Sequence, residues 1–273
     1  MFAWRALYLR IYAGLAVVLS LWSLLHLFQG DWGWLGALLA WGHLPCINCW
    51  RRYHSNFAFR DERERLAMTS TMLGVGLVLI AGSRDWALAA TLGGLFGLLI
   101  YVFIASALPR GLREEEGETG SLAGLTLSDG DRERTLSELN TDKPVLLLVM
   151  HSASHCYSRM AARELQLMLS DGQLPLSAEQ CVLLFPGAIP QWCQELTEQG
   201  VHCWNDSEGD SLATLGLWLR GGNWSFAGGP HAARPTLALL QAGQSSAKIW
   251  IESVNFRLPP SLQDNLAKIS RLV

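Results

Sequence analysis

The segment Lys143-Pro-Val-Leu-Leu-Leu-Val-Met-His-Ser-Ala-Ser-His-Cys156-Tyr-Ser-Arg decides the fold of the second half of the chain. Val145–Met150 is a continuous apolar run, which is typical of a central strand buried on both faces. Residues 158–169 then place apolar side chains at helical spacing directly after that strand. A buried strand followed at once by an amphipathic helix predicts an α/β domain.

The rest of residues 122–273 continues the alternation of strands and helices. The pattern predicts strands at Leu125–Leu127 and Val182–Phe185, helices at 190–199 and 261–272, and a hairpin of Thr236–Leu240 with Lys248–Ile251 around Ala-Gly-Gln.

This order of elements is that of the thioredoxin fold, and two motifs resemble that superfamily. Residues 125–165, from LTLSDG to AAREL, look like the opening of redoxin domains of the TlpA and methylamine-utilisation accessory type. Arg234-Pro235-Thr236 resembles the segment that carries the family's cis-proline, which faces the active site. The resemblance implies a thioredoxin-like domain with a thiol site before the first helix.

The predicted active-site turn lacks the family's pair of cysteines. In one register His155 replaces the nucleophilic cysteine and Ser158 the resolving one; in another, Cys156 begins a turn with Tyr157 and Ser158. A thiol at a helix N-terminus beside an imidazole favours the reactive thiolate. The alternative is a thioredoxin fold that has lost its redox centre and serves as a binding module. A peroxidatic role is not expected, since the Pro and Thr that usually precede such a cysteine are missing.

Other polar groups of this domain have open roles. Cys181 is expected to be a small core residue. Cys193 and Cys203 could pair with each other, resolve Cys156 or be structural. His231 and Arg234 precede Pro235, and they either face the active site or are solvated.

Residues 1–110 are far more apolar than the rest and predict an α-helical membrane bundle of three or four spans. The spans are expected near 7–28, 66–82 and 86–108. Residues 32–50 form either a short span or an interfacial segment, because their glycines and Pro45 weaken the helix. The acidic segment 111–121 is predicted to be a linker.

Within the apolar region lies His43-Leu-Pro-Cys46-Ile-Asn-Cys49-Trp50. Pro-Cys-x-x-Cys-Trp resembles the signature of DsbB-type membrane oxidoreductases. That resemblance implies electron transfer from a thiol-bearing, thioredoxin-like protein partner to a quinone. Here, however, a charged stretch follows the motif and residues 66–108 hold no second cysteine pair. Arg51 and Arg52 lie where that family approaches quinone with an arginine, or they mark the membrane boundary.

The competing chemistry of this motif is metal binding. His43, Cys46, Cys49 and His54 have a plausible spacing for zinc or copper. A covalent haem is disfavoured because Trp50, rather than His, follows the second cysteine. The favoured interpretation is thiol–disulfide exchange or redox maturation of a partner protein, ahead of metal handling and of two buried free thiols.

The predicted spans place the Cys46/Cys49 end and everything after residue 110 on one side of a bilayer, since the chain crosses out and back between them. We expect a multi-pass protein of a bacterial inner membrane. The arginines on that side favour the cytoplasm, whereas disulfide chemistry favours the periplasm. A formal net charge of −3 excludes the basic footprint of a nucleic-acid-binding protein.

Overall fold

The computed structural model describes residues 2–54, 64–82, 85–108, 122, 125–130, 132–223 and 229–273. The chain divides into two compact units: a helical unit that ends at Ala107, and a C-terminal unit that runs from Leu108 to Val273. The predicted linker at 111–121 lies outside the described residues.

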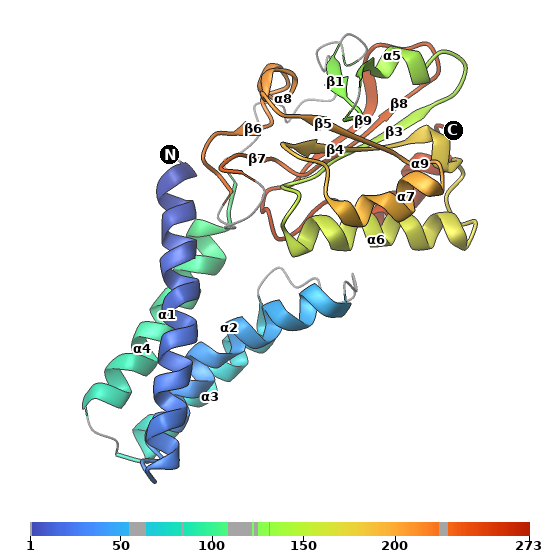
Figure 1. The fold of residues 1–273 in the computed structure, drawn as a ribbon. Helices are drawn as coiled ribbons and strands as arrows, with labels where there is room; N and C mark the ends of the chain where they lie inside the picture. Colours follow the sequence, from blue (N-terminus) through green and yellow to red (C-terminus); the bar gives the residue numbers. More distant parts are fainter. Residues whose placement is uncertain are drawn as a thin grey trace. The chain divides into compact units, whose positions relative to one another are not determined.

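The described residues of the helical unit form four α-helices (Figure 1). They are α1 (Phe2–Phe28), α2 (Trp34–His54), α3 (Arg65–Ile80) and α4 (Asp85–Ile100), the last continued by a π-helical turn, Tyr101–Ala105. Ala3–Phe28 and Trp86–Ala105 are long and apolar enough to cross a membrane, while α3 is apolar but shorter. Among the described residues α2 does not reach that standard of length and apolarity.

Helix α2 differs from the prediction for residues 32–50. It runs unbroken through Pro45 and the C-x-x-C motif and continues beyond Trp50 to His54. Its last part is tied to the next helix, because the buried guanidinium of Arg51 donates to both carboxylate oxygens of Glu64, at 2.8 and 2.9 Å. This two-bond ion pair holds the charged end of α2 against the start of α3.

The interior of the helical unit combines small and hydroxyl-bearing residues with some large ones, such as Trp41 and Leu98. Ala37, Ala40, Thr71 and Thr91 are fully buried. Large apolar side chains lie outside instead: Leu7, Ile11, Leu15, Val18, Leu21, Trp22, Leu25, Leu73, Leu79, Ile80, Trp86, Phe96 and Phe103 are all exposed. Small residues between helices and large apolar residues outside are typical of helices packed in lipid.

The close approach of α2 and α3 depends on glycine. A Cβ added to Gly74 of α3 would collide with the backbone oxygen of Gly36 in α2. A Cβ added to Gly76 of the same helix would meet no other atom within 4 Å. Two glycines of one helix therefore differ only in what lies beside them.

We predict opposite effects for Gly74→Ala and Gly76→Ala. Alanine at position 76 should raise the free energy of unfolding by up to about 1 kcal/mol, through helix propensity alone. Alanine at position 74 should lower it by about 1–3 kcal/mol, since the helices must move apart. Thermal unfolding of the full chain in detergent measures both. Equal shifts in the two variants would contradict the packing described above.

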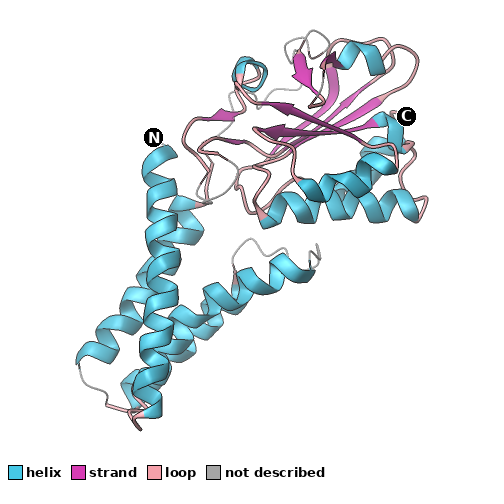
Figure 2. Cartoon of the chain, viewed as in Figure 1, coloured by secondary structure: helices cyan, strands magenta, loops and turns pink. Residues whose placement is uncertain are grey.

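The C-terminal unit is built on a seven-stranded sheet (Figure 2). Its strand order is β2 (Glu133–Thr135), β1 (Thr126–Ser128), β5 (His202–Asp206), β4 (Cys181–Pro186), β3 (Val145–Val149), β8 (Thr236–Leu240) and β9 (Ala247–Glu252). β3, β4 and β5 are parallel, whereas β8 is antiparallel to β3 and β9 is antiparallel to β8.

The connections of this sheet confirm the thioredoxin-like fold. Helix α6 (Cys156–Ser170) links parallel β3 and β4, and the hairpin β8–β9 is followed by α9 (Leu262–Ser270), which gives the order β4-β3-β8-β9. Between β4 and β8 the chain inserts α7 (Gln194–Glu198), β5, α8 (Asp210–Thr214) and the short pair β6 (Trp218–Leu219) and β7 (Ala232–Ala233). Helix α5 (Leu136–Leu139) precedes β3.

Both faces of β3 are buried, as its apolar run predicts. Leu146 and Leu148 belong to the core beneath α6 and α9, and Val145, Leu147 and Val149 to the core on the other face. Helices α6, α7 and α9 lie together on one face of the sheet (Figure 1). The carboxylate of Glu164 on α6 joins two of them, because it accepts hydrogen bonds from the Ser261 hydroxyl (2.7 Å) and from the first amides of α9.

Candidate thiol sites

Cys46 and Cys49 lie one turn apart on α2, and both side chains are exposed as free thiols. Residues three apart in a helix are neighbours on its surface, so the two thiols share one side of α2. Because both thiols are exposed, the alternative in which they are buried free thiols is wrong. Both thiols lie at the surface of the helical unit.

The metal interpretation gains no cluster from the described side chains. Among them, no three His, Cys, Asp or Glu groups come together as metal ligands. His43 is buried and its Nδ1 lies 3.4 Å from the backbone oxygen of Leu39. The side chain of His54 lies outside the description, so the four-residue set of His43, Cys46, Cys49 and His54 stays a prediction.

Helix α6 begins at Cys156, with His155 as its N-cap residue. The His155 side chain accepts a hydrogen bond from the Tyr157 amide (3.4 Å), and the rings of these two residues stack with centroids 5.0 Å apart. Ser158 is buried, and its hydroxyl accepts from the Ser152 amide. His155, Tyr157 and Ser158 therefore build the turn, while Cys156 is half-buried and reaches the surface at the first helical position.

The structure adds His151, which the sequence analysis did not single out. It follows β3, and its buried imidazole lies 5.1 Å from the Phe256 ring in a stacked arrangement and 5.2 Å edge-on from His155. Its Nδ1 donates to the Ala233 carbonyl oxygen at 2.9 Å, which leaves the buried Nε2 as an acceptor without a protein partner. Burial lowers the pKa of His151 to about 4. The spacing of His151 and His155 across the turn was the available signal in the sequence.

A small cavity lies behind this turn. It has a volume of about 10 Å³, room for about one water molecule, and is lined by His151, Tyr157, Ser158, Pro235 and Phe256 among others. Pro235 thus faces the turn, as the resemblance implied. The implied cis bond is not present, since none of the described peptide bonds is cis.

Two expectations for the residues before Pro235 need correction. Arg234 is neither solvated nor part of the cavity lining, because it is buried and its Nε lies 3.2 Å from the Glu252 carboxylate. Its amide donates to the Leu217 carbonyl oxygen. His231 packs against Trp218 and accepts from the Gly221 amide, so it belongs to the β6–β7 insertion.

The remaining cysteines occupy the core of the C-terminal unit. Cys181 is fully buried at the start of β4, as expected for a core residue, and burial raises the pKa of its thiol to about 12. Cys193 and Cys203 are both buried and belong to the same core cluster. Both are free cysteines, and their pairing with each other or with Cys156 stays a prediction.

Comparisons with known proteins found similar solved structures but no related sequence. No protein-family model and no curated protein matches the sequence. Similar solved structures include a reduced Prx3 from Vibrio vulnificus (13% identity, TM-score 0.44, covering 60% of this chain and 99% of that one). A peroxiredoxin-like protein from Aquifex aeolicus (10%, 0.45, 58% and 90%) and a PrxQ variant from Xylella fastidiosa (16%, 0.43, 59% and 98%) are also similar. With TM-scores below 0.5, these likenesses carry no information about chemistry.

The buried imidazole of His151 predicts a pH-dependent stability. Its folded pKa, about 4, is below the ordinary value of 6.5, so the unfolded chain binds the proton first as the pH falls. Stability present at neutral pH is therefore lost below about pH 6.5, with about 2 kcal/mol lost by about pH 5. His151→Phe should remove this part of the loss. Chemical unfolding of the full chain at about pH 7 and at about pH 5 measures the loss of stability.

His231→Gln serves as the matched control for His151→Phe and should leave the loss unchanged. The same loss in wild type and His151→Phe would show that other groups cause it.

Proposed function

We propose that this chain is a membrane-bound thiol–disulfide exchange protein that serves the redox maturation of a partner protein. The observation that carries the proposal is the exposure of both thiols of the Cys46/Cys49 pair on one side of α2. The thioredoxin-like unit would bind or deliver the partner, with Cys156 as a single auxiliary thiol.

The membrane part of the proposal is supported by the inside-out composition of the helical unit. Its exposed surface is rich in Leu, Ile, Phe and Trp, and its two longest apolar helices, Ala3–Phe28 and Trp86–Ala105, can each cross a bilayer. With α2 and α3 as further crossings, the unit has four spans. Cys46, Cys49 and the thioredoxin-like unit then share one side of the membrane, as the sequence topology predicts.

The proposed exchange proceeds in two steps that conserve electrons. A thiolate of Cys46 or Cys49 attacks a sulfur of the partner's disulfide, and the partner's other sulfur leaves as a thiolate. The neighbouring cysteine then loses its proton and attacks the mixed disulfide, which releases the partner's second thiol. The pair becomes a disulfide, and the partner is reduced; the reverse sequence oxidises a partner dithiol.

The residues around the motif do not fit the quinone that the DsbB resemblance implies. Arg51, which would approach the quinone, has its guanidinium bonded twice to the buried Glu64 carboxylate. The side chain of Arg52 lies outside the described residues. We therefore route no step through a quinone.

The second candidate function is a binding module without redox turnover. It is favoured by the turn at α6, where Ser158 is buried and hydrogen-bonded at the position of a resolving cysteine. In that case the helical unit anchors the module, and metal handling by His43, Cys46, Cys49 and His54 remains a further alternative.

Replacing one cysteine of the C-x-x-C should trap the proposed intermediate. In Cys49→Ser or Cys46→Ser, whichever thiol attacks stays linked to the partner, since its resolving neighbour is absent. Non-reducing electrophoresis of the full chain from cells should then show a reducible adduct. Cys181→Ser, a buried cysteine of the other unit, is the control and should trap nothing.

The double variant Cys46→Ser/Cys49→Ser should abolish the adduct and alter the thiol status of the trapped partner in cells. An unchanged thiol status would reject exchange and leave the binding module. Stoichiometric zinc or copper in the purified chain, lost on His43→Ala, would favour metal handling instead.

The single thiol of Cys156 has a separate prediction. A helix N-terminus stabilises a thiolate, so Cys156 should react with iodoacetamide about tenfold faster than a free cysteine at about pH 7. Mass spectrometry of the full chain with only this cysteine retained measures the rate. A rate equal to that of free cysteine would make Cys156 a passive member of the binding surface.

A further inference from the structure

Strand β5 has a neighbouring strand along only part of its outer edge. On its inner edge every residue from His202 to Asp206 is paired with β4. On its outer edge β1 pairs with it at one position, Ser128 with Asn205. In the part of the chain that the structure describes, no other strand lies along this edge, so residues 202–204 are paired on one side only.

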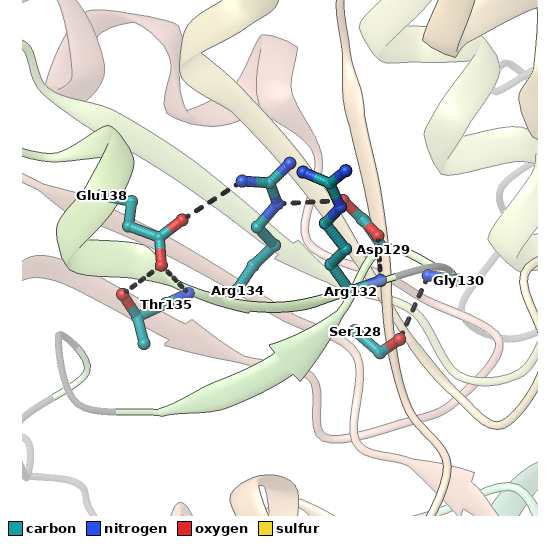
Figure 3. A network of polar contacts seen from close by, with 7 residues as sticks. All are labelled: Ser128, Asp129, Gly130, Arg132, Arg134, Thr135 and Glu138. Atoms are coloured by element: carbon teal, nitrogen blue, oxygen red, sulfur yellow. Dashed lines mark hydrogen bonds and ion pairs between the residues drawn. The ribbon is translucent and has the colours of Figure 1, made fainter.

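Strand β1 ends at Ser128 because the chain turns back there into β2. The Asp129 amide donates to the Arg132 carbonyl oxygen, and the Asp129 carboxylate accepts from the Arg132 amide at 2.8 Å. The Ser128 hydroxyl accepts from the Gly130 amide (Figure 3). Since β2 lies on the far side of β1 from β5, this closed turn leads the chain away from the outer edge of β5.

The hydrogen bonds of the sheet determine which backbone groups of β5 face outward. The Asp206 carbonyl oxygen accepts from the Gly187 amide at the end of β4, so the backbone groups of Asp206 point toward β4. Every second residue of a strand faces the same neighbour, so Asn205 and Cys203 point to the outer edge. Asn205 meets Ser128 there. The N–H and C=O of Cys203 have no described strand opposite them and can pair with one more strand.

This part of the edge lies in a groove with a volume of about 490 Å³. Cys203 and Trp204 line the groove from β5. Ile189 lines it as well and packs against the core beneath α6, whereas Leu139 lines it and packs against the core on the other face of the sheet. Because side chains of a strand alternate between two faces, an extended segment in the groove would contact both cores.

The lining of the groove carries more negative than positive charge. Arg134 donates to Asp129 at 2.9 Å and lies 3.6 Å from the Glu138 carboxylate, so one guanidinium is shared by two carboxylates (Figure 3). Burial lowers the pKa of His202, which also lines the groove, and keeps its imidazole neutral near pH 7. The lining thus has a net negative charge and favours a cationic occupant.

We propose that this groove binds an extended segment of a partner protein that carries lysine or arginine, and that the segment adds to β5 as a strand opposite Cys203. Main-chain hydrogen bonds to Cys203 hold the segment, its apolar side chains contact Ile189 or Leu139, and its basic side chains meet Asp129 and Glu138. The inference rests on the proposed function in that it specifies how the thioredoxin-like unit holds the partner. The binding itself involves no thiol chemistry.

The experiment uses the full chain in detergent with Cys46→Ser and Cys49→Ser, and its probe is a fluorescein-labelled peptide of alternating lysine and valine. Fluorescence anisotropy should show saturable binding, and the matched peptide of glutamate and valine should bind about tenfold more weakly. Methylating one backbone amide of the peptide at a time should weaken binding at alternate positions only. The reason is that every second N–H of an added strand faces β5.

Two pairs of protein variants locate the peptide. Thr197 is exposed and lines the groove, so Thr197→Arg should abolish binding by filling the groove and repelling lysine, whereas Thr197→Ser should not. Glu138→Gln should weaken binding roughly threefold, about the effect of one exposed ion pair. Glu195→Gln removes the same charge from an exposed position outside the lining and should leave binding unchanged.

No saturable binding below about 1 mM, or methylation effects that do not alternate, would overturn the proposal even if a variant fails to fold. Equal binding of the two peptides would overturn the assigned charge of the partner. Hydrogen exchange at the Cys203 amide that slows as protein concentration rises, without peptide, would identify a second copy as the occupant and also overturn it.

Failure of this proposal is distinguishable from failure of the proposed exchange. An adduct trapped by Cys49→Ser or Cys46→Ser without peptide binding in the groove would reject strand addition alone. Peptide binding with alternating methylation effects, but without a trapped adduct, would support the groove and reject the exchange.

Discussion

The C-terminal unit depends on the burial of one short strand on both of its faces. All five residues of β3 are buried, with β4 paired on one edge and β8 on the other. A shift of β3 by one residue would exchange the side chains of two separate cores, so its register is strongly determined. The end of this strand then places His151 and the start of α6. The geometry around Cys156 is a consequence of that register.

The helical unit packs differently from the sheet of the C-terminal unit. Its helices approach closely at glycine, alanine and hydroxyl side chains, and they expose many of their large apolar residues. Van der Waals contact between closely approaching helices therefore contributes to the packing. The C-x-x-C motif lies at the end of α2, where the Arg51–Glu64 ion pair joins this helix to α3. The exposed thiols are therefore attached to a firmly held helix end.

The six cysteines show how surroundings decide thiol chemistry. Cys46 and Cys49 are exposed neighbours on a helix, Cys156 is half-buried at a helix start, and Cys181 is a core residue with a raised pKa. Cys193 and Cys203 are buried, yet one of them lines an open groove. Only the first pair shares a spacing that a sequence motif can record. Cys193 and Cys203 share one core because the chain reverses between α7 and β5.

From the sequence alone, the apolar run Val145–Met150, the helix after it and the hairpin after Pro235 were enough to predict the thioredoxin-like fold. Strands and helices impose their own periodicity on the chain, so local patterns show them. The apolar helices near residues 7–28 and 86–108 were predicted for the same reason. Tertiary structure alone decided which side chains meet: His151 with Phe256, and Arg51 with Glu64. It also turned Arg234 inward to Glu252, against the expectation of a solvated or site-facing residue. Contacts between distant residues depend on how elements pack, and local patterns hold no record of that packing.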